Sequence, residues 1–269
     1  MRSSSEIFQS ATHDWSETIR STIAEDQFHY AETIGSTNDH LMELAKHSGT
    51  KPFTLSLTEH QTAGRGRRGD AWIAPAGRNL LFSILLDLPD SSRHWSRLPH
   101  IIAWCLGSAV ESLCGDSSQI QTKWPNDLYL KGKKLAGILV ETQLNPRPRA
   151  IVGIGINVNM RPEEFPPELR DTAISLYEII ECESSRWYLL SLFLENLITR
   201  YPDAMDDFDG CLSWLRERDF LIGRKLSLQS GGKTIEGTAA GLNDDGALLL
   251  ETSDTNKTPI ITCESMTIR

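Results

Sequence analysis

The chain has 269 residues, with 27 Lys and Arg against 36 Asp and Glu, which gives a formal net charge of -9. This shortage of positive charge excludes a protein that binds long nucleic acids by neutralising their phosphates, so we expect no DNA partner. A composition of 39% hydrophobic and 23% charged residues is that of a globular protein, and it excludes disordered and collagen-like chains.

Hydrophobic spacing predicts the elements of the first half of the chain. Residues 1–25 are polar and acidic with one weakly amphipathic stretch, and we interpret them as an N-terminal arm. A helix-start signal, Ser36-Thr37-Asn38-Asp39, opens a stretch of helical spacing that ends at Gly49. Alternation predicts a strand at 53–58, a continuous apolar run predicts a buried strand at 80–86, and apolar residues over 98–113 recur at helical spacing.

The second half alternates short strands with turns before it returns to helices. Strands are predicted at 120–124, 128–130, 135–143 and 150–158, with connections so short that neighbouring strands must be antiparallel. Helices are predicted at 187–201 and 208–220, and from residue 222 onward short strands with Gly and Asn turns indicate a small β-barrel. We therefore expect an α+β fold with a mixed, largely antiparallel sheet, divided as an arm (1–25), a main domain (26–220) and a C-terminal barrel (221–269).

The chain carries no pattern typical of a membrane span, a disulfide framework or a cysteine metal site. No apolar stretch approaches the roughly 18 residues of a membrane helix, and no signal-peptide core appears at the start. The five cysteines are widely spaced and never form Cys-x-x-Cys, and no His-Glu-x-x-His occurs. We expect a cytoplasmic protein with reduced thiols and no membrane partner.

Positive charge is concentrated in two segments despite the overall deficit. Residues 61–80 and residues 121–135 each carry a net charge of +3, and the remaining 234 residues carry -15. The first segment contains Gly64-Arg-Gly-Arg-Arg-Gly69, which fits the Gly-x-Gly-x-x-Gly pattern of dinucleotide-binding folds. That interpretation fails because Pro75 and Gly77 stand where the pyrophosphate-binding helix would begin. The segment could be a solvated loop, but arginine forks, flexible glycines and Trp72 together suit a loop that closes over a nucleotide.

Several motifs occur in the order and approximate spacing of the biotin protein ligases. They are the 64–69 loop, Lys-Trp-Pro-Asn-Asp at 123–127, Lys-Leu-Ala-Gly-Ile at 134–138, Gly-Ile-Gly-Ile-Asn-Val-Asn at 153–159, Ser-Thr-Asn at 36–38 and Ala-Ile-Ser-Leu at 173–176. The chain resembles that family from about residue 30 to its end. The resemblance implies a class II synthetase-like catalytic domain, shared with lipoate ligases, and an SH3-like C-terminal barrel.

The resemblance also implies a reaction and its participants. Biotin ligases join the biotin carboxylate to the α-phosphate of ATP, release pyrophosphate, and pass the acyl group to a lysine of a biotin carboxyl carrier protein. Because this step brings an anion to a polyanion, fixed cations and Mg²⁺ are needed where they meet. By similarity, Lys134, Arg67 and Arg65 are the catalytic candidates. From the residues alone, Lys134 could equally be a solvated hairpin lysine.

Biotin's neutral ureido ring calls for hydroxyl and amide partners in an apolar cleft. The family positions that contact biotin are matched by Ser36, Thr37, Asn38, Gln61, Gly64, Arg65, Arg67, Gly137 and Gly153. Those that contact ATP or the adenylate are matched by Arg67, Arg68, Trp72, Lys123, Asn126, Lys134 and Asn157. Asp127 is a candidate Mg²⁺ ligand, or alternatively a turn cap. Ser36 and Thr37 could instead cap a helix, and the glycines could serve packing.

Two departures from the family pattern bear on function. Ligases that also repress transcription carry a helix-turn-helix domain of roughly 60 residues before the Ser-Thr-Asn segment, whereas 35 residues precede Ser36 here. We expect the monofunctional type. Asp70 and Ala71 replace basic residues found in many relatives, which weakens the expected grip on pyrophosphate. A lipoate or octanoate ligase is the nearest alternative, and a single-stranded RNA-binding module is a remote one. The sequence leaves open whether the chain forms a homodimer.

Overall fold

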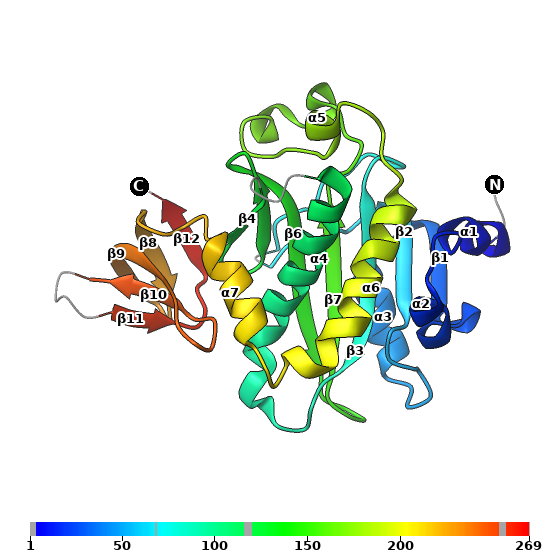
Figure 1. Cartoon of the computed structure of the whole chain (residues 1–269), viewed down its shortest axis with the longest axis horizontal. Coiled ribbons are helices and arrows are strands. Elements are labelled where there is room, and N and C mark those ends of the chain that lie inside the picture. The colour runs from blue at the N-terminus through cyan, green and yellow to red at the C-terminus, as the bar shows by residue number, and fades with distance from the viewer. Residues whose placement is uncertain (1–3, 68, 116–119, 253–256, 269) are drawn as a thin grey trace.

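A computed structural model describes residues 4–67, 69–115, 120–252 and 257–268. Its centre is a mixed sheet of seven strands in the order β1-β2-β3-β7-β6-β5-β4 (Figure 1). In this sheet β1 and β2 pair in parallel and the other neighbours are antiparallel, as the short connections predicted for the strands from β4 to β7. The strands are β1 (Phe28–Ile34), β2 (Leu55–Gln61), β3 (Leu80–Asp87), β4 (Ile120–Lys123), β5 (Asp127–Leu130), β6 (Lys133–Gln143) and β7 (Arg149–Ile156).

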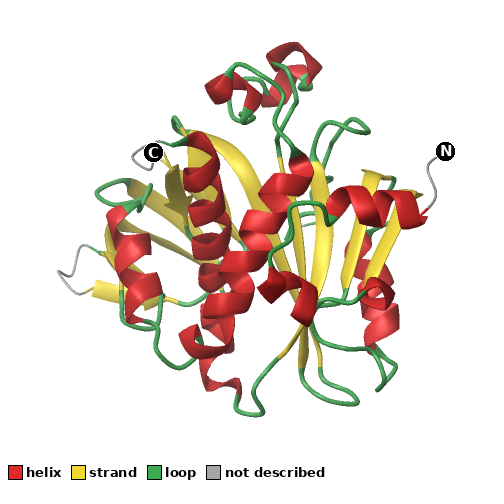
Figure 2. Cartoon of the chain, turned by 45° about the vertical axis from the view of Figure 1, so that its right-hand side comes forward, coloured by secondary structure: helices red, strands yellow, loops and turns green. Residues whose placement is uncertain are grey.

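Helices cover both faces of this sheet. The long helices α4 (Leu98–Cys114) and α6 (Arg186–Ala204) cross one face, and α3 (Thr37–Ala45) packs on the opposite face (Figures 1 and 2). A short helix, α5 (Tyr177–Ile180), follows the proline-rich segment, and α7 (Asp209–Glu217) packs against α4. At that contact Gly107 lies so close to the Trp214 ring that a Cβ there would overlap it, which explains a glycine inside a buried helix.

The period of two in the strands decides which side chains meet α3. In β3, Phe82 and Ile84 face the large core under α4 and α6, whereas Leu85 joins Leu41 and Ala45 of α3 in a smaller cluster. Ser83 shares the face of Leu85, because alternate residues of a strand point the same way. The polar side chains of the middle strands therefore lie on the α3 face.

A buried arginine fixes the C-terminal end of α3. The Arg149 side chain is fully buried and donates to the carbonyl oxygens of Ala45, His47 and Thr50, at 3.2, 3.4 and 2.7 Å. Asp87 Oδ1 lies 3.3 Å from its Nε. A cation at a helix C-terminus compensates the unpaired carbonyls there, so this contact anchors α3 to β7 and thereby sets the position of its N-terminus.

The N-terminal segment, interpreted from the sequence as an arm, packs into the main core. It forms α1 (Ser4–Ala11) and α2 (Glu17–Thr22), and the ring of Phe8 meets those of Trp15 and Phe28 at centroid distances of 5.9 and 5.3 Å. Trp15 and Ile19 are almost fully buried. The strand β1 that follows was not predicted, because its mixed polar sequence lacks a clear period of two.

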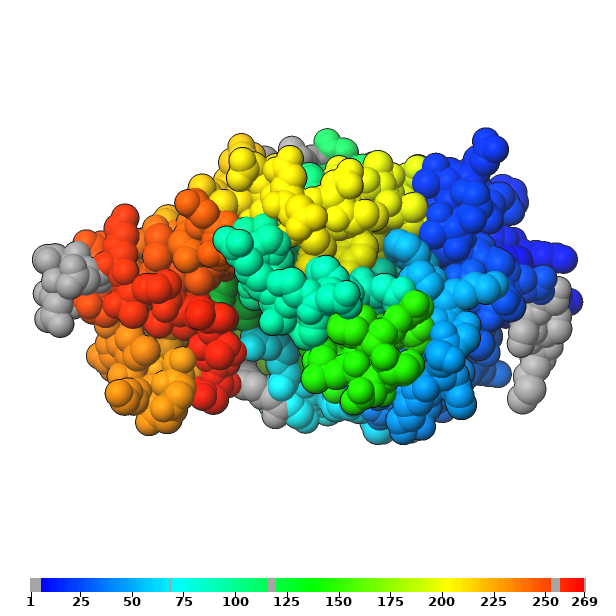
Figure 3. Space-filling view, turned by 90° about the horizontal axis from the view of Figure 1, so that it is seen from below, coloured from blue at the N-terminus to red at the C-terminus, as the bar shows by residue number. Residues whose placement is uncertain are grey.

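The C-terminal unit is a separate five-stranded antiparallel sheet in the order β11-β10-β9-β8-β12. Its strands are β8 (Lys225–Ser230), β9 (Lys233–Leu242), β10 (Leu248–Glu251), β11 (Lys257–Ile260) and β12 (Ser265–Ile268). In Figure 3 this unit, orange and red, lies at the end of the molecule opposite the blue N-terminal segment. Trp124 Nε1 donates to the Gly246 carbonyl at 3.1 Å, which joins the two parts. The α+β fold class with a small C-terminal β unit is confirmed.

Among the described residues, no helix combines the length and apolar character that crossing a bilayer would require.

Candidate active site

A cleft on the α3 face of the main sheet collects most of the predicted site residues. Its walls come from the start of α3, the end of β2, the loop after β2, the β4–β5 turn, and strands β6 and β7. The residues just before and within β12 close one side, so the C-terminal unit also contributes to the cleft. The predicted residues that line it are Ser36, Thr37, Asn38, Gln61, Arg65, Arg67, Trp72, Lys123, Asn126, Asp127, Lys134, Gly137 and Gly153.

The N-terminus of α3 forms the polar end of the cleft. Ser36 caps the helix, with its Oγ accepting from the Asp39 amide at 3.4 Å, as helix-start chemistry predicted. The Gln61 side-chain oxygen accepts from the Thr37 amide at 2.9 Å and lies 3.2 Å from the Thr37 hydroxyl. Ser36, Thr37 and Gln61 all line the cleft. The segment that caps the helix can therefore also contact a ligand.

Ser83 of β3 connects this helix to the sheet and was not predicted as a site residue. Its hydroxyl donates to Asn38 Oδ1 at 2.5 Å and lies 2.7 Å from Thr37 Oγ1. The Asn38 amide nitrogen in turn donates to Glu141 Oε2 of β6 at 2.7 Å. These buried polar groups satisfy one another in one orientation, as buried hydrogen-bonding groups must. The sequence signal that could have indicated Ser83 is its position as a single polar residue inside the apolar run 80–86.

Glycines on β6 and β7 make one wall of the cleft flat. A Cβ on Gly153 would overlap the Asn38 amide, and a Cβ on Gly155 would stand 2.5 Å from the Trp72 ring. On Gly137 it would stand 3.1 Å from the same ring. Trp72 therefore lies against Gly137 and Gly155, and these glycines serve close approach to an aromatic side chain.

The basic loop folds back on itself as a tight hairpin. The Gly66 amide donates to the Asp70 carbonyl at 2.8 Å and the Trp72 amide to the Gly64 carbonyl at 3.0 Å, so Arg65 pairs with Ala71. Gly69 has φ of +81°, a conformation that favours glycine. No helix follows among the residues described there, which agrees with the rejection of the dinucleotide fold. The predicted residue Arg68 lies outside the described part of the chain.

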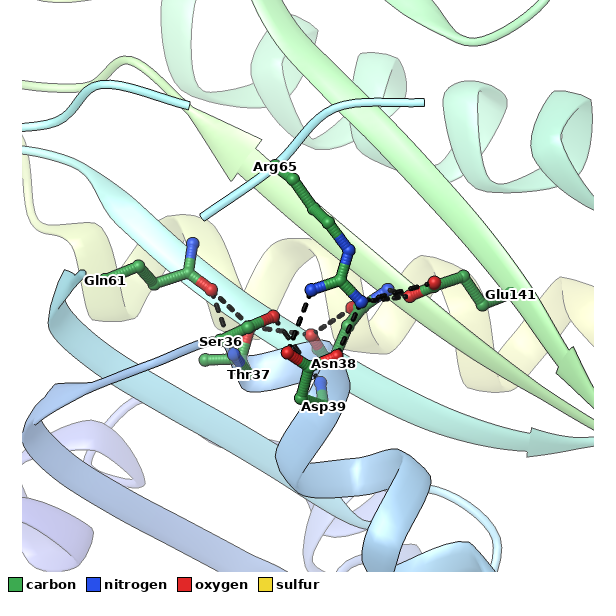
Figure 4. Close-up of polar contacts among 8 residues, drawn as sticks. Ser36, Thr37, Asn38, Asp39, Gln61, Arg65 and Glu141 are labelled. Atoms are coloured by element: carbon green, nitrogen blue, oxygen red, sulfur yellow. Dashed lines mark hydrogen bonds and ion pairs between the residues drawn. The ribbon is translucent and has the colours of Figure 1, made fainter. Parts of the chain in front are cut away.

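The two described arginines of the loop differ in their contacts, because α3 and β6 hold Arg65 but not Arg67. Arg65 makes a paired contact with Asp39, Nη1 to Oδ2 at 2.8 Å and Nη2 to Oδ1 at 2.5 Å, and its Nη2 lies 3.3 Å from Glu141 Oε1 (Figure 4). The guanidinium holds the pKa of Asp39 below its ordinary value. Arg67 is exposed and donates to Asn126 Oδ1 at 3.4 Å. The Arg65 side chain is thus directed at protein carboxylates, and Arg67 remains beside the open cleft.

Lys134 reaches the cleft because strand β6 is irregular beside it. The register between β5 and β6 shifts between Leu128 and Tyr129, and such a bulge redirects the nearby side chains. Its main chain also bonds to the 172–174 segment, with the Lys134 amide 2.7 Å from the Thr172 carbonyl. The Lys134 ammonium lies 2.9 Å from Asp127 Oδ1, and the two side chains are 35% and 19% exposed. It is therefore a fixed, partly buried cation.

Two of the remaining predicted residues, Asn157 and Gly64, do not line the cleft. Asn157 does not line the cleft, since its amide group bonds to Asn79 and to the Ile174 carbonyl, both at 3.1 Å. It thereby holds the 173–176 segment that supports Lys134. Gly64 packs against the Gln61 side chain instead of facing the opening. Lys123 lines the cleft and its Nζ lies 3.1 Å from the Tyr129 hydroxyl.

The cleft collects only part of the charge that the two basic segments carry. Four described cations line it, namely Arg65, Arg67, Lys123 and Lys134, together with the carboxylates of Asp70, Asp127 and Glu264. Arg78 points elsewhere and pairs with Glu164 and Glu183, both at 2.9 Å. The arrangement combines a polar end that can hydrogen-bond a neutral ring, a flat aromatic wall and a cationic region between them. It suits a ligand that joins an uncharged heterocycle to an anion.

Within the described ranges, no three or more His, Cys, Asp and Glu side chains gather as a ready-made metal site. Mg²⁺ often binds through only one or two carboxylates, with waters and substrate phosphates completing its shell. The Asp127 carboxylate lines the cleft beside Lys134 and fits that limited role.

Family models match both parts of the chain. The model of the "Biotin/lipoate A/B protein ligase family" matches residues 30–159, and that of the "Biotin protein ligase C terminal domain" matches residues 221–262. The first covers most of β1 and all of β2 to β7, with the part of the cleft that the main sheet builds, and the second covers most of the C-terminal sheet.

Relatives and solved structures resemble the chain over most of its length. It is 34% identical over 228 residues to the "Bifunctional ligase/repressor BirA" of Bacillus subtilis, covering 84% of this chain and 69% of the relative. It is 31% identical over 221 residues to the "Biotin--[acetyl-CoA-carboxylase] ligase" of Mycobacterium tuberculosis, covering 81% and 80%. The structure of the biotin protein ligase from Aquifex aeolicus in complex with biotin and ATP matches with a TM-score of 0.77 and 29% identity, covering 90% of this chain and 99% of that one.

Proposed function

Since the chain belongs to the biotin protein ligase family, we propose that it ligates biotin to a lysine of a biotin carboxyl carrier protein at the cost of ATP. One structural observation links this proposal to particular residues. The fixed Lys134–Asp127 pair, with its 2.9 Å contact, shares one cleft with the polar end at Ser36, Thr37 and Gln61. This arrangement supports a role for Lys134 as the cation at the point where the carboxylate of a ligand, held by its ring at the polar end, meets a phosphate.

The reaction proceeds in two transfers. In the first, a biotin carboxylate oxygen attacks the α-phosphorus of ATP, the bond to the β-phosphate oxygen breaks, and pyrophosphate leaves with its electron pair. In the second, the uncharged amine of the carrier lysine attacks the acyl carbon of biotinyl-5'-AMP, loses a proton, and AMP leaves. Both transfers gather negative charge at the same place, so preorganised cations lower both barriers.

We assign the roles as follows. Lys134 stabilises the charge on the carboxylate and α-phosphate oxygens, and Arg67, which is exposed beside Asn126, is available to the phosphates. Trp72 offers an aromatic face for the adenine at the glycine wall. Mg²⁺, when bound with ATP, neutralises phosphate charge, and Asp127 is the carboxylate in the cleft that would help hold it.

The polar end of the cleft favours biotin over lipoate or octanoate. Thr37, Asn38, Gln61 and Ser83 form a connected set of donors and acceptors, which a ureido ring can join and an alkyl or dithiolane chain cannot. A site built to hydrogen-bond its substrate rejects analogues that leave its polar groups unpaired. Among the residues that the structure describes, the cleft sets four cations against three carboxylates, which is a small excess for binding the backbone of a single-stranded nucleic acid.

A direct experiment incubates the purified chain with ATP, Mg²⁺, biotin and an isolated carrier domain, and measures the mass of the carrier. We expect a gain of one biotinyl group that depends on ATP, and no gain with lipoate or octanoate in place of biotin. Thermal shifts with each acid alone provide a second readout, because a ligand stabilises the state that binds it. Equal modification with lipoate would contradict the proposal.

A further inference from the structure

The Arg65 guanidinium is held by carboxylates from two separate elements. Asp39, from the first turn of α3, receives two hydrogen bonds in a fork, and Glu141, from β6, receives a third (Figure 4). The Arg65 and Glu141 side chains are 33% and 30% exposed, so water screens that contact only partly, whereas Asp39 is 58% exposed and its contact is screened more strongly. A planar fork facing a carboxylate is a more directional contact than a lysine could make.

The Glu141 carboxylate is itself held in place by a hydrogen bond from Asn38. Its Oε2 accepts from Asn38 Nδ2 at 2.7 Å, and Asn38 is fixed by the Ser83 hydroxyl. The glutamate therefore has one bond to the polar end of the cleft and another to the loop. Through it, the residues proposed to recognise the ureido ring are linked to residues 64–72 by a continuous series of hydrogen bonds.

This geometry is unsuited to direct contact between Arg65 and the reacting atoms. Both terminal nitrogens already donate to protein carboxylates, and a substrate carboxylate would have to compete with Asp39 and Glu141 for them. Arg67, two residues on, makes a long contact with Asn126 at 3.4 Å and no ion pair with any residue that the structure describes. The resemblance assigned Arg65 to the biotin carboxylate, and its partners here favour a different role.

We propose that Asp39 and Glu141 are positioning residues that clamp Arg65 and so hold residues 64–67 and 69–72 over the cleft before any substrate binds. The clamp lowers the entropy that the loop loses when biotin arrives, so it strengthens biotin binding without touching the reacting atoms. It also keeps Arg67 and Trp72, in the same hairpin, near their proposed positions. This inference rests on the proposed function for its effect on biotin, but the clamp itself can be tested without any substrate.

The test uses the full chain with Asp39→Asn and Glu141→Gln, and the first readout is trypsin cleavage after Arg65 and Arg67 in the absence of ligand. We expect each variant to accelerate cleavage in the loop by about three- to tenfold, since each removes charge-assisted bonds. Asp39→Glu, which keeps the charge, should restore much of the protection. The matched control is Glu43→Gln on the same helix, whose carboxylate pairs with Lys46 instead.

The second readout is the kinetics of biotin-dependent adenylation. A clamp that preorganises the loop predicts a rise in KM for biotin of about three- to tenfold with kcat changed less than twofold. Unchanged cleavage in both variants would overturn the proposal, and so would a fall in KM, because that would show the carboxylates competing with biotin for Arg65. If the wild-type chain fails to adenylate biotin, the proposed function fails while the cleavage experiment still decides the clamp.

Discussion

Lys134 of β6 lies 2.9 Å from Asp127 of β5, and both line a cleft whose wall of glycines lets the Trp72 ring lie close against the sheet. Both residues belong to the basic segment 121–135, and the pair joins its hairpin lysines to the Lys-Trp-Pro-Asn-Asp turn. The carboxylate fixes the lysine, and the lysine keeps the carboxylate at the place where phosphates would enter. Most of the expected consequences follow from this arrangement.

Asp127→Asn should weaken the response to Mg²⁺. The variant keeps the size of the side chain but removes the charge that would help hold the metal and the ion-pair partner of Lys134. We expect the Mg²⁺ concentration for half-maximal adenylation to rise by about tenfold, with a lower maximal rate. Asp90→Asn, which alters an exposed carboxylate outside the cleft, serves as the control. Identical Mg²⁺ curves for wild type and Asp127→Asn would remove Asp127 from the metal site.

Gly155→Ala should displace Trp72 from the wall of the cleft. The new methyl group would stand 2.5 Å from the indole, closer than packed atoms approach, so the ring must move. We expect KM for ATP to rise about tenfold, and Trp72→Ala with Gly155→Ala to be no worse than Trp72→Ala alone, because both changes act on one contact. Gly49→Ala, where a Cβ has no neighbour within 4 Å, is the control. Additive effects on KM would count against this role of the glycine.

Ser83→Ala should weaken biotin binding although Ser83 is buried behind the cleft. The change leaves Asn38 Oδ1 without its donor, and an unsatisfied buried acceptor costs about 1–3 kcal/mol. Asn38 would then be free to rotate, and calorimetry should find biotin bound about tenfold more weakly. Ser112→Ala, which removes an exposed hydroxyl that donates to the Ser108 carbonyl of its own helix, should bind as wild type does. Wild-type affinity in Ser83→Ala would show that the Asn38 orientation does not matter.

The buried His100 should make the folded state less stable in mild acid. Burial lowers the pKa of His100 to about 4 from 6.5, against the opposing effect of a hydrogen bond with the Gly246 backbone. The unfolded chain therefore binds a proton that the folded chain does not as pH falls from 6.5 towards 4, so stability is lost in that window. This group alone should cost about 2 kcal/mol between pH 7 and pH 5.

The measurement is urea unfolding at those two pH values for wild type and for His100→Gln, which cannot titrate. The variant should lose about 2 kcal/mol less than wild type does over the same interval. Carboxylates and the other histidines affect both proteins alike, so the difference isolates His100. Equal losses in the two proteins would show that the imidazole is not buried in its neutral form.

The predictable part of the fold came from strong local patterns. A continuous apolar run predicted β3, and helical spacing predicted α4. The short turns from β4 to β7 predicted that these strands pair antiparallel. The strand β1 and the helices α1 and α2 were missed because their stability comes from tertiary packing. Trp15 is only 5% exposed because it packs against Phe8 and Phe28, which nothing in its own neighbourhood indicates.

The candidate site divides in the same way. Residues that belong to contiguous motifs, such as Lys134 and Trp72, were predicted and line the cleft. Partners that meet only in space, such as Ser83 and Glu141, carry no motif and depend on the sheet register. Asn157 shows the converse, because it lies in a motif yet its amide holds the 173–176 segment instead of facing the cleft. The residues before β12 could not be assigned to the cleft from the sequence, because they reach it only through the tertiary docking of the C-terminal unit.

The most direct measurement of the central claim is the exchange of labelled pyrophosphate into ATP by wild type, Lys134→Gln and Lys133→Gln. Lys133 neighbours Lys134 but donates to the Arg170 carbonyl at 2.8 Å, so it is a matched control. We predict exchange that requires biotin, falls by about 100-fold or more in Lys134→Gln, and is unchanged in Lys133→Gln. Exchange without biotin, or equal rates in the two variants, would contradict the account.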